Sequence, residues 1–277
     1  MLVRSGFVSG QIMVVIVTAE GEFPSERSFV NALTSRFPEI KSIVHNVSVD
    51  ELELTLGEKS RTLYGNGFIE ERLCGLDFRI SPRSFYQVNP VQTEILYAKA
   101  KELALLGEEG KIGRLIDAYC GTGTIGLTMA DSCESVIGVE LNGDAVCDAE
   151  KNAELNGVGD RLGFLVGNVL YSDFMEDLGS FDCILSNPPY IETKQIPLLD
   201  EELAFEPEAA LDGGDDGLDF YRVIIGEYGK YLTEGGIMLL EIGCDQAKDI
   251  SSIASSAGMR CEIFKDYGGN DRVAVIK

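Results

Sequence analysis

The sequence predicts an α/β fold: a mostly parallel sheet with an antiparallel last strand, preceded by a small α+β domain. Strand and helix patterns alternate after Arg114, which is typical of a parallel sheet with helices on both faces. Two strand patterns joined by the turn residues Gly268–Asp271 close the chain and predict a hairpin. The 277 residues are enough for about two domains. We place these domains at residues 1–85 and 86–277.

The first domain mixes strand patterns with one helix pattern. Gly10–Thr18 and Ile40–Val49 are rich in β-branched residues and predict strands. Between them, Ser25–Phe37 has apolar residues at helical spacing and begins with a serine, which predicts an amphipathic helix capped by the Ser25 side chain. Several short strand-like pieces follow up to about Ile80.

The second domain begins with a helix pattern and continues with the alternating elements. The helices are predicted at Val91–Leu106, Thr124–Ser132, Asp144–Asn156, Leu218–Leu232 and Ala247–Ala257. The strands are predicted at Arg114–Tyr119, Ser135–Leu141, Leu162–Val166, Phe181–Ser186, Ile237–Ile242, Arg260–Tyr267 and Arg272–Ile276.

The composition argues against several classes of protein. With 46 acidic and 23 basic residues, the formal net charge is −23, which disfavours binding to a phosphate backbone by bulk electrostatics. Seven scattered cysteines without a C-x-x-C pair predict free thiols in a reducing, cytoplasmic compartment, and no metal site. The apolar run Ile12–Val17 is too short to span a bilayer and predicts a buried strand, so we expect neither a membrane contact nor a leader.

A glycine-rich turn, Asp117–Gly126, follows a strand pattern and opens a helix pattern. Glycines allow the backbone to approach a ligand closely and place it at the helix N-terminus. Glu140 ends the next strand, where a carboxylate can accept hydrogen bonds from both hydroxyls of a ribose. The spacing of Gly121, Gly123 and Gly126 also matches a dinucleotide fingerprint. A nicotinamide cofactor therefore stays open at this point.

A second motif follows the strand pattern Phe181–Ser186, and we call it the N-P-P-Y turn (Asn187–Tyr190). The carboxyl end of a parallel strand faces the crevice where ligands bind, and two prolines stiffen the turn. An asparagine amide donates and accepts hydrogen bonds, which suits a planar amide or amine of a substrate. This motif favours S-adenosylmethionine over nicotinamide. The predicted catalytic residues are Asn187, Pro188, Pro189 and Tyr190.

These two motifs together resemble the class I S-adenosylmethionine-dependent methyltransferases, which implies a Rossmann-like sheet. Residues from about 181 to 277 resemble the bacterial release-factor glutamine methyltransferases, on stretches such as Ser186–Ile191, Ala210–Gly214 and Leu240–Gly243. Residues from about 1 to 142 resemble the rRNA uracil-5-methyltransferases, above all at Ile80–Pro90, and the first domain resembles their central domain. The resemblance thus implies a composite chain whose junction, between residues 142 and 168, is not sharply located.

The resemblance implies S-adenosylmethionine as the cofactor and assigns contacts to it by matching position. These are Gln87, Asp117, Tyr119, Gly121, Gly123, Thr124, Glu140, Asn168 and Asn187. Asn168 stands where many relatives have aspartate, and its carbonyl could still accept from the adenine amino group. Gln87 could instead be an ordinary polar residue of the linker.

The leading hypothesis for the function is N-methylation of a glutamine side-chain amide in a peptide-chain release factor. Such a transfer needs alignment of the amide nitrogen more than acid–base power, and the Asn187 side chain with the backbone near Pro188 could supply it. Glu192–Asp219 is rich in carboxylates; it is either a solvated face or a lid that favours a protein partner with basic character over RNA.

Two alternatives stay open. An rRNA uracil-5-methyltransferase needs a cysteine nucleophile and a base; Cys244 and Asp271 are the candidates, although the residues around Cys244 favour an ordinary buried thiol. A cofactor-binding domain without turnover is the other. This second alternative stays open because we expect neither of the substrate-binding parts of the two families, which are the RNA-binding barrel of many uracil methyltransferases and the helical domain of glutamine methyltransferases. The oligomeric state is not predicted.

Overall fold

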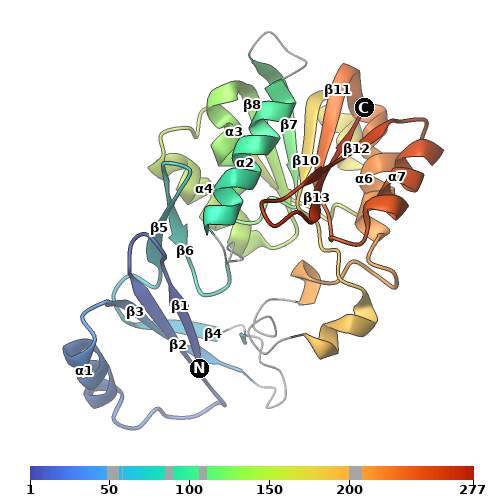
Figure 1. The fold of residues 1–277 in the computed structure, drawn as a ribbon. Helices are drawn as coiled ribbons and strands as arrows, with labels where there is room; N and C mark the ends of the chain where they lie inside the picture. The colour runs from blue at the N-terminus through green and yellow to red at the C-terminus, as the bar shows by residue number, and fades with distance from the viewer. Residues whose placement is uncertain (49–55, 58, 85–89, 106–110, 200–207) are drawn as a thin grey trace. The chain divides into compact units, whose positions relative to one another are not determined.

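The computed structural model describes residues 1–48, 56–57, 59–84, 90–105, 111–199 and 208–277 (Figure 1). The chain divides into two compact units. The first comprises Met1–Tyr86 with Leu199–Pro207, and the second comprises Gln87–Leu198 with Glu208–Lys277. Within the described residues, no helix is both long enough and apolar enough to cross a membrane.

The first unit is built on a four-stranded sheet in the order β1-β2-β3-β4. Only β2 and β3 are parallel to each other, and the helix α1 connects them. A separate hairpin, β5–β6, follows. The elements are β1 (Leu2–Ser5), β2 (Ile12–Thr18), α1 (Glu26–Arg36), β3 (Ile40–Val47), β4 (Lys59–Tyr64), β5 (Ile69–Leu73) and β6 (Leu76–Ile80).

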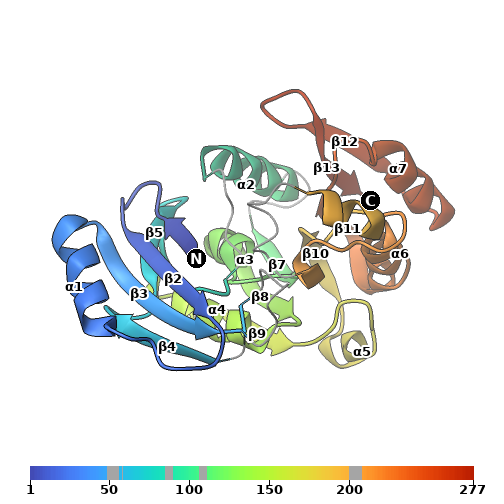
Figure 2. The ribbon, with the colours of Figure 1, turned by 90° about the horizontal axis from the view of Figure 1, so that it is seen from below.

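Apolar side chains lie on both faces of this sheet. On one face, Val30 and Leu33 of α1 pack against the cluster of Val14, Ile40 and Ile43. On the other face, Ile69 and Ile80 of the hairpin pack with Met13, Val15 and Val44. Figure 2 shows α1 and the hairpin on opposite sides of the sheet. A strand that is covered on both faces needs no polar alternation, which explains the uninterrupted apolar run of β2.

The predicted cap of the first helix is wrong. Ser25 has left-handed backbone geometry, with φ of 62°, and its side chain makes no capping hydrogen bond. A capping residue normally has an extended backbone, which aims its side-chain oxygen at the first free N–H groups. The helix therefore begins at Glu26 without a serine cap.

The second unit contains a seven-stranded sheet in the order β12-β13-β11-β10-β7-β8-β9. The five strands from β11 to β9 are parallel, and β13 is antiparallel to both β11 and β12. The predicted α/β class with an antiparallel last strand is confirmed. The strands are β7 (Ile112–Ala118), β8 (Cys133–Glu140), β9 (Leu162–Val166), β10 (Phe181–Ser186), β11 (Leu232–Glu241), β12 (Cys261–Lys265) and β13 (Asp271–Ile276).

Helices cover this sheet: α4 contacts β8 and β9, while α7 contacts β12 and β13 (Figure 1). A core cluster of this unit includes Tyr221, Ile224 and Tyr228, so α6 and the turn that follows it bury their apolar side. The α-helices are α2 (Pro90–Leu105), α3 (Thr124–Met129), α4 (Gly143–Leu155), α5 (Phe174–Leu178), α6 (Asp219–Gly226) and α7 (Ala247–Ser256). The helix predicted at Leu218–Leu232 is shorter, because it ends at a glycine, Gly226, and a 3₁₀ turn leads into β11.

The parallel strands bring four chain segments to one edge of the sheet. Since parallel strands point the same way, the carboxyl ends of β7, β8, β10 and β11 lie at that edge. They are Ala118, Glu140, Ser186 and Glu241. Both sequence motifs begin there.

Candidate active site

The glycine-rich turn between β7 and α3 has an unusual backbone. Tyr119, Gly121 and Gly123 all have positive φ values, of 72°, 54° and 79°. A Cβ atom on Gly123 would lie 2.6 Å from Cδ1 of Leu127 and 3.2 Å from Cβ of Ala149, so a larger residue there would force its neighbours to shift. A Cβ atom on Gly121 would meet no described atom within 4 Å. The turn is therefore packed tightly behind Gly123 and open beside Gly121.

Asp117 lies at the base of this turn and is fully buried. Its Oδ2 accepts a hydrogen bond of 2.8 Å from the backbone N–H of Gly126. Its Oδ1 has no partner among the described residues. Burial raises the pKa of Asp117 to about 7, and the nearby charge of Glu140 acts in the same direction. The unpaired oxygen is a place for a donor from a ligand.

Glu140, at the end of β8, is held by two backbone N–H groups. Its Oε2 accepts from Gly121 at 3.0 Å and its Oε1 accepts from Asn142 at 2.8 Å. Burial raises the pKa of Glu140 against the lowering effect of these bonds. Each carboxylate oxygen has a second lone pair. The fixed carboxylate can therefore still accept from the two hydroxyls of a ribose.

The other predicted cofactor residues differ in how free their polar atoms are. The Oγ1 of Thr124 lies 3.1 Å from the hydroxyl of Tyr97, in a buried pair. Oδ1 of Asn168 already accepts from the backbone N–H of Leu170 at 2.9 Å, which leaves one lone pair for an adenine. Gln87 lies outside the described residues.

Tyr119 links the glycine-rich turn to the carboxylate-rich segment. Its hydroxyl donates to the backbone carbonyl of Ala209 at 3.2 Å, and its ring meets Phe220 edge-on at 5.0 Å between centroids. Burial raises the pKa of Tyr119 to about 12, so the hydroxyl stays protonated and can donate.

The N-P-P-Y turn is anchored at both ends. Just before it, the hydroxyl of Ser186 donates to the backbone carbonyl of Ala118 at the end of β7. At its far end, the backbone carbonyl of Tyr190 accepts from Nε2 of Gln246 at 3.0 Å. Asn187, between these anchors, is half-buried. The two anchors fix the segment that carries the Asn187 amide.

Sequence reasoning missed Gln246 as a functional residue. It lies 56 positions after Tyr190 in the chain, in the loop between β11 and α7, and is 8% exposed. The local sequence Gly243–Gln246 contains no signal that its side chain would reach the N-P-P-Y turn.

A group of ionisable side chains lies behind this turn. Burial raises the pKa of Tyr190, and the charges of Glu241 and Cys244 add to this effect. Burial also raises the pKa of Glu241 to about 7, although Arg272 opposes it. Oε2 of Glu241 has no partner among the described residues. Cys244 is exposed, so the expectation of a buried thiol is wrong. It follows β11, whose neighbour β10 leads into the N-P-P-Y turn.

Asp271, the base considered from the sequence, lies at the start of β13. Its carboxylate forms an ion pair of 2.7 Å with Lys265 of β12. This pair ties the two strands of the terminal hairpin together.

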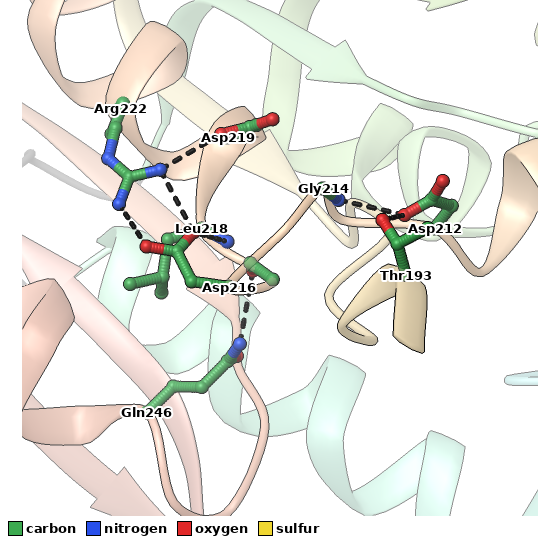
Figure 3. A network of polar contacts seen from close by, with 9 residues as sticks. Thr193, Asp212, Gly214, Asp216, Leu218, Asp219, Arg222 and Gln246 are labelled. Carbon is green, nitrogen blue, oxygen red and sulfur yellow. Dashed lines mark hydrogen bonds and ion pairs between the residues drawn. The ribbon is translucent and has the colours of Figure 1, made fainter. Parts of the chain in front are cut away.

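Part of the carboxylate-rich segment is also held in place, and we call residues 208–219 the cover segment. Ile191 donates its N–H to the carbonyl of Leu211 at 3.0 Å, and Gly213 donates back to Ile191 at 2.8 Å. Asp212 accepts from Thr193 at 2.8 Å, as Figure 3 shows. The described part is thus bonded to the chain that follows the N-P-P-Y turn, whereas residues 200–207 lie outside the described residues.

Comparison with known proteins adds a family and relatives. Residues 100–214 match the family Methyltransferase small domain. An uncharacterized RNA methyltransferase of Oceanobacillus iheyensis is 37% identical over 209 residues, which are 75% of this chain and 44% of that protein. A similarly named protein of Bacillus cereus is 42% identical over 155 residues, 56% of this chain and 33% of that protein. The chain thus spans less than half the length of these relatives.

Among solved structures, the chain is similar to the Pyrococcus abyssi tRNA (uracil-54, C5)-methyltransferase in complex with S-adenosyl-L-homocysteine. The TM-score is 0.65 at 22% identity, over 99% of this chain and 57% of that one. The class I methyltransferase fold is therefore confirmed. With the match to a methyltransferase domain, the prediction of S-adenosylmethionine as the cofactor is confirmed as well.

The prediction of a release factor as the partner is wrong, because the relatives that share most of this chain are named RNA methyltransferases. The resemblance of the last hundred residues to glutamine methyltransferases, and with it the composite chain, finds no support in these comparisons. The acidic charge, which was the argument against RNA, is unevenly distributed along the chain. Residues 1–86 hold nine basic and eleven acidic residues, whereas residues 87–277 hold 14 basic and 35 acidic ones.

Proposed function

We propose that this chain is the catalytic part of an S-adenosylmethionine-dependent RNA methyltransferase. The observation that carries the proposal is the identity of 37% over 209 residues to a protein named as an RNA methyltransferase. That alignment covers three quarters of this chain, which is more than the matched methyltransferase domain alone.

The distribution of charge supports an RNA substrate better than the total does. Almost the whole excess of acidic residues lies after residue 86, so the first 86 residues are close to neutral. Contacts with phosphates depend on local basic groups rather than on net charge. We assign RNA contacts to the first unit, whose exposed basic residues include Lys41, Arg36 and Arg27.

The residues of the glycine-rich turn fit the cofactor. When bound, S-adenosylmethionine supplies a methyl group on a positively charged sulfur, already activated for transfer. Oδ1 of Asp117 is buried, has no partner within the described part of the chain, and suits a cationic donor such as an amino group. The carboxylate of Glu140 suits the ribose hydroxyls. The open space beside Gly121 lets a ligand approach the backbone.

For the acceptor we propose C5 of a uracil, with Cys244 as the nucleophile. Its thiolate would add to C6 and make C5 a carbanion equivalent that takes the methyl group; a base then removes the C5 proton and the thiolate leaves. Cys244 is exposed, and it follows β11, whose neighbour β10 leads into the N-P-P-Y turn. Glu241, with a pKa of about 7, is a better candidate base than the ion-paired Asp271.

The test is methylation of an RNA transcript with labelled S-adenosylmethionine, followed by mass spectrometry of the nucleosides. We expect 5-methyluridine. Cys244→Ala should reduce its formation by about a thousandfold or more, since no other group replaces a covalent nucleophile. Cys147→Ala, a change at another exposed cysteine of the same unit, is the matched control and should leave the rate unchanged.

Transcripts that contain 5-fluorouracil give a second readout. Fluorine at C5 cannot leave as a proton does, so a covalent protein–RNA adduct should accumulate and migrate slowly on a denaturing gel. Cys244→Ala should abolish the adduct. If S-adenosylhomocysteine binds but no RNA is methylated, the proposed function is refuted and cofactor binding without turnover remains.

A second acceptor is favoured by one specific observation. Hydrogen bonds at Ser186 and at Tyr190 fix both ends of the N-P-P-Y turn. The amide of Asn187 between them could therefore orient the exocyclic amine of a nucleobase. An N-methylated nucleoside that survives Cys244→Ala and disappears with Asn187→Ala would establish this acceptor instead of uracil C5.

A further inference from the structure

Gln246 uses its side-chain amide to join three segments that are far apart in the sequence. Its Nε2 donates to the carbonyl of Tyr190 at 3.0 Å and to the carbonyl of Gly217 at 3.1 Å. Its Oε1 accepts from the backbone N–H of Gly243 at 2.9 Å. Both amide hydrogens are therefore engaged, and the residue is 8% exposed. Figure 3 shows Gln246 reaching toward the segment that carries Gly214 to Leu218.

The backbones around this amide approach too closely for other side chains. A Cβ atom on Gly217 would lie 2.5 Å from the carbonyl oxygen of Tyr190, and one on Gly213 would lie 2.8 Å from Cα of Tyr190. A Cβ atom on Gly243 would lie 2.9 Å from Oε1 of Gln246. Glycines at these three positions allow a single amide to bridge all the segments.

Besides its backbone bonds to Ile191, the cover segment has side-chain bonds that are exposed. Asp216 and Asp219 pair with Arg222, and Asp212 pairs with Thr193, all at the surface. Exposed ion pairs contribute little because water competes for both charges. The buried amide of Gln246 is therefore the stronger of the described side-chain ties between the cover segment and the N-P-P-Y turn.

We infer that Gln246 is a positioning residue for methyl transfer, which holds the carbonyl of Tyr190 and the cover segment in register. The inference rests on the proposed function. It concerns the acceptor end of the site, by which we mean the N-P-P-Y turn and the cover segment. The glycine-rich turn has its own bonds, from Asp117 and Glu140, and does not depend on Gln246. Loss of the amide should therefore slow transfer without weakening cofactor binding.

The experiment compares Gln246→Glu and Gln246→Met with the wild type. A glutamate keeps an acceptor for Gly243 but, when ionised, donates to neither carbonyl. A methionine keeps the volume but has no donor. We expect kcat to fall at least about tenfold in both variants. The dissociation constant of S-adenosylhomocysteine, measured by calorimetry, should change less than about twofold, because its contacts lie elsewhere.

The control is Glu262→Gln, which makes the reverse exchange of the same two groups at an exposed position of β12 in the same unit. It should leave kcat unchanged. Gly213→Ala is an independent variant that pushes the cover segment away from Tyr190 and should lower kcat in the same way. Hydrogen exchange of the Ile191 and Gly213 amides should be faster in both Gln246 variants.

The inference is overturned if kcat of both Gln246 variants stays within about twofold of the wild type. It is also overturned if kcat and cofactor affinity fall in parallel, which is the sign of general loss of structure. Hydrogen exchange and calorimetry need no RNA. These two measurements therefore test whether Gln246 holds the cover segment even if the wild type methylates no transcript. Absence of methylation would refute only the proposed function.

Discussion

The two turns of the site are held in opposite ways. In the glycine-rich turn, Gly126 bonds to Asp117, nine residues away, and Gly121 bonds to Glu140, 19 residues away. In the N-P-P-Y turn, Ser186 bonds to Ala118 over 68 residues, and Tyr190 bonds to Gln246 over 56 residues. The bonds that hold the Asp117 and Glu140 carboxylates therefore lie within one strand–helix–strand unit, although Tyr119 of the same turn also bonds to the distant Ala209. The N-P-P-Y turn, in contrast, is held by partners that only the assembled sheet supplies.

The largest effect should come from Asp117, the buried group of the local turn. Its pKa of about 7 in the folded protein exceeds the ordinary aspartate value of 3.8, so the folded protein binds more protons than the unfolded chain between these values. Stability should therefore fall as pH rises from about 4 to 7, by up to about 4 kcal/mol from this group. Asp117→Asn should remove this fall.

Urea unfolding of wild type and Asp117→Asn at pH 4 and pH 8 measures this difference. Carboxylates remote from Asp117 contribute equally to both proteins and cancel, whereas Glu140, whose charge acts on Asp117, is part of the measured difference. Equal pH dependence in both proteins would show that the Asp117 carboxylate is not buried without a partner, and would remove the main contrast between the turns.

Gly123→Ala should destabilise the local turn by about 3 kcal/mol, because strain at positive φ adds to a clash with Leu127. Gly157→Ala is the control, since Gly157 also has positive φ, of 67°, but a Cβ atom there meets no described atom within 4 Å. The control should lose only about 1 kcal/mol, from strain alone. Chemical denaturation of both variants measures the two losses of stability. Equal losses would mean that the turn is not tightly packed around Gly123.

Ser186→Ala tests the distant anchoring of the N-P-P-Y turn. It removes the bond to Ala118 and leaves a buried carbonyl with one partner fewer, so stability should fall by about 1–2 kcal/mol. The rate of methyl transfer should fall more than cofactor affinity does. If cofactor affinity fell as much as the rate, the two ends of the site would not be independent.

Tyr119→Phe should have the smallest effect. It removes the hydrogen bond to Ala209 but keeps the ring contact with Phe220. A loss of stability below about 1 kcal/mol is expected, measured by thermal unfolding. A larger loss would mean that the hydrogen bond from Tyr119 to Ala209 holds the cover segment more strongly than a single exposed bond is expected to do.

The same contrast explains what could be predicted from the sequence. The turn around Gly121 and Gly123 could be predicted because its partners lie nearby in the chain and its glycines are required by backbone geometry. Gln246 could not, since a glutamine in a loop carries no sign of the three backbones that it joins. The exposure of Cys244 was also missed, because burial depends on neighbours that only the assembled sheet supplies.

The identity of the partner was the larger error. An N-P-P-Y turn indicates how a planar nitrogen could be oriented, but it does not encode the molecule that carries that nitrogen. Net charge did not help either, because the acidic residues are concentrated after residue 86. The predicted helix cap failed for a local reason, since the left-handed backbone of Ser25 turns its side chain away from the helix.

The position of β13 has a consequence for the order of folding. β13 comes after the other six strands of its sheet in the sequence, yet it lies between β11 and β12. During synthesis, β12 therefore has no neighbour in the sheet until Asp271–Ile276 leaves the ribosome, and the core around Ile276 stays open. The first unit, whose strands are all made earlier, can fold while the second still waits for its last strand.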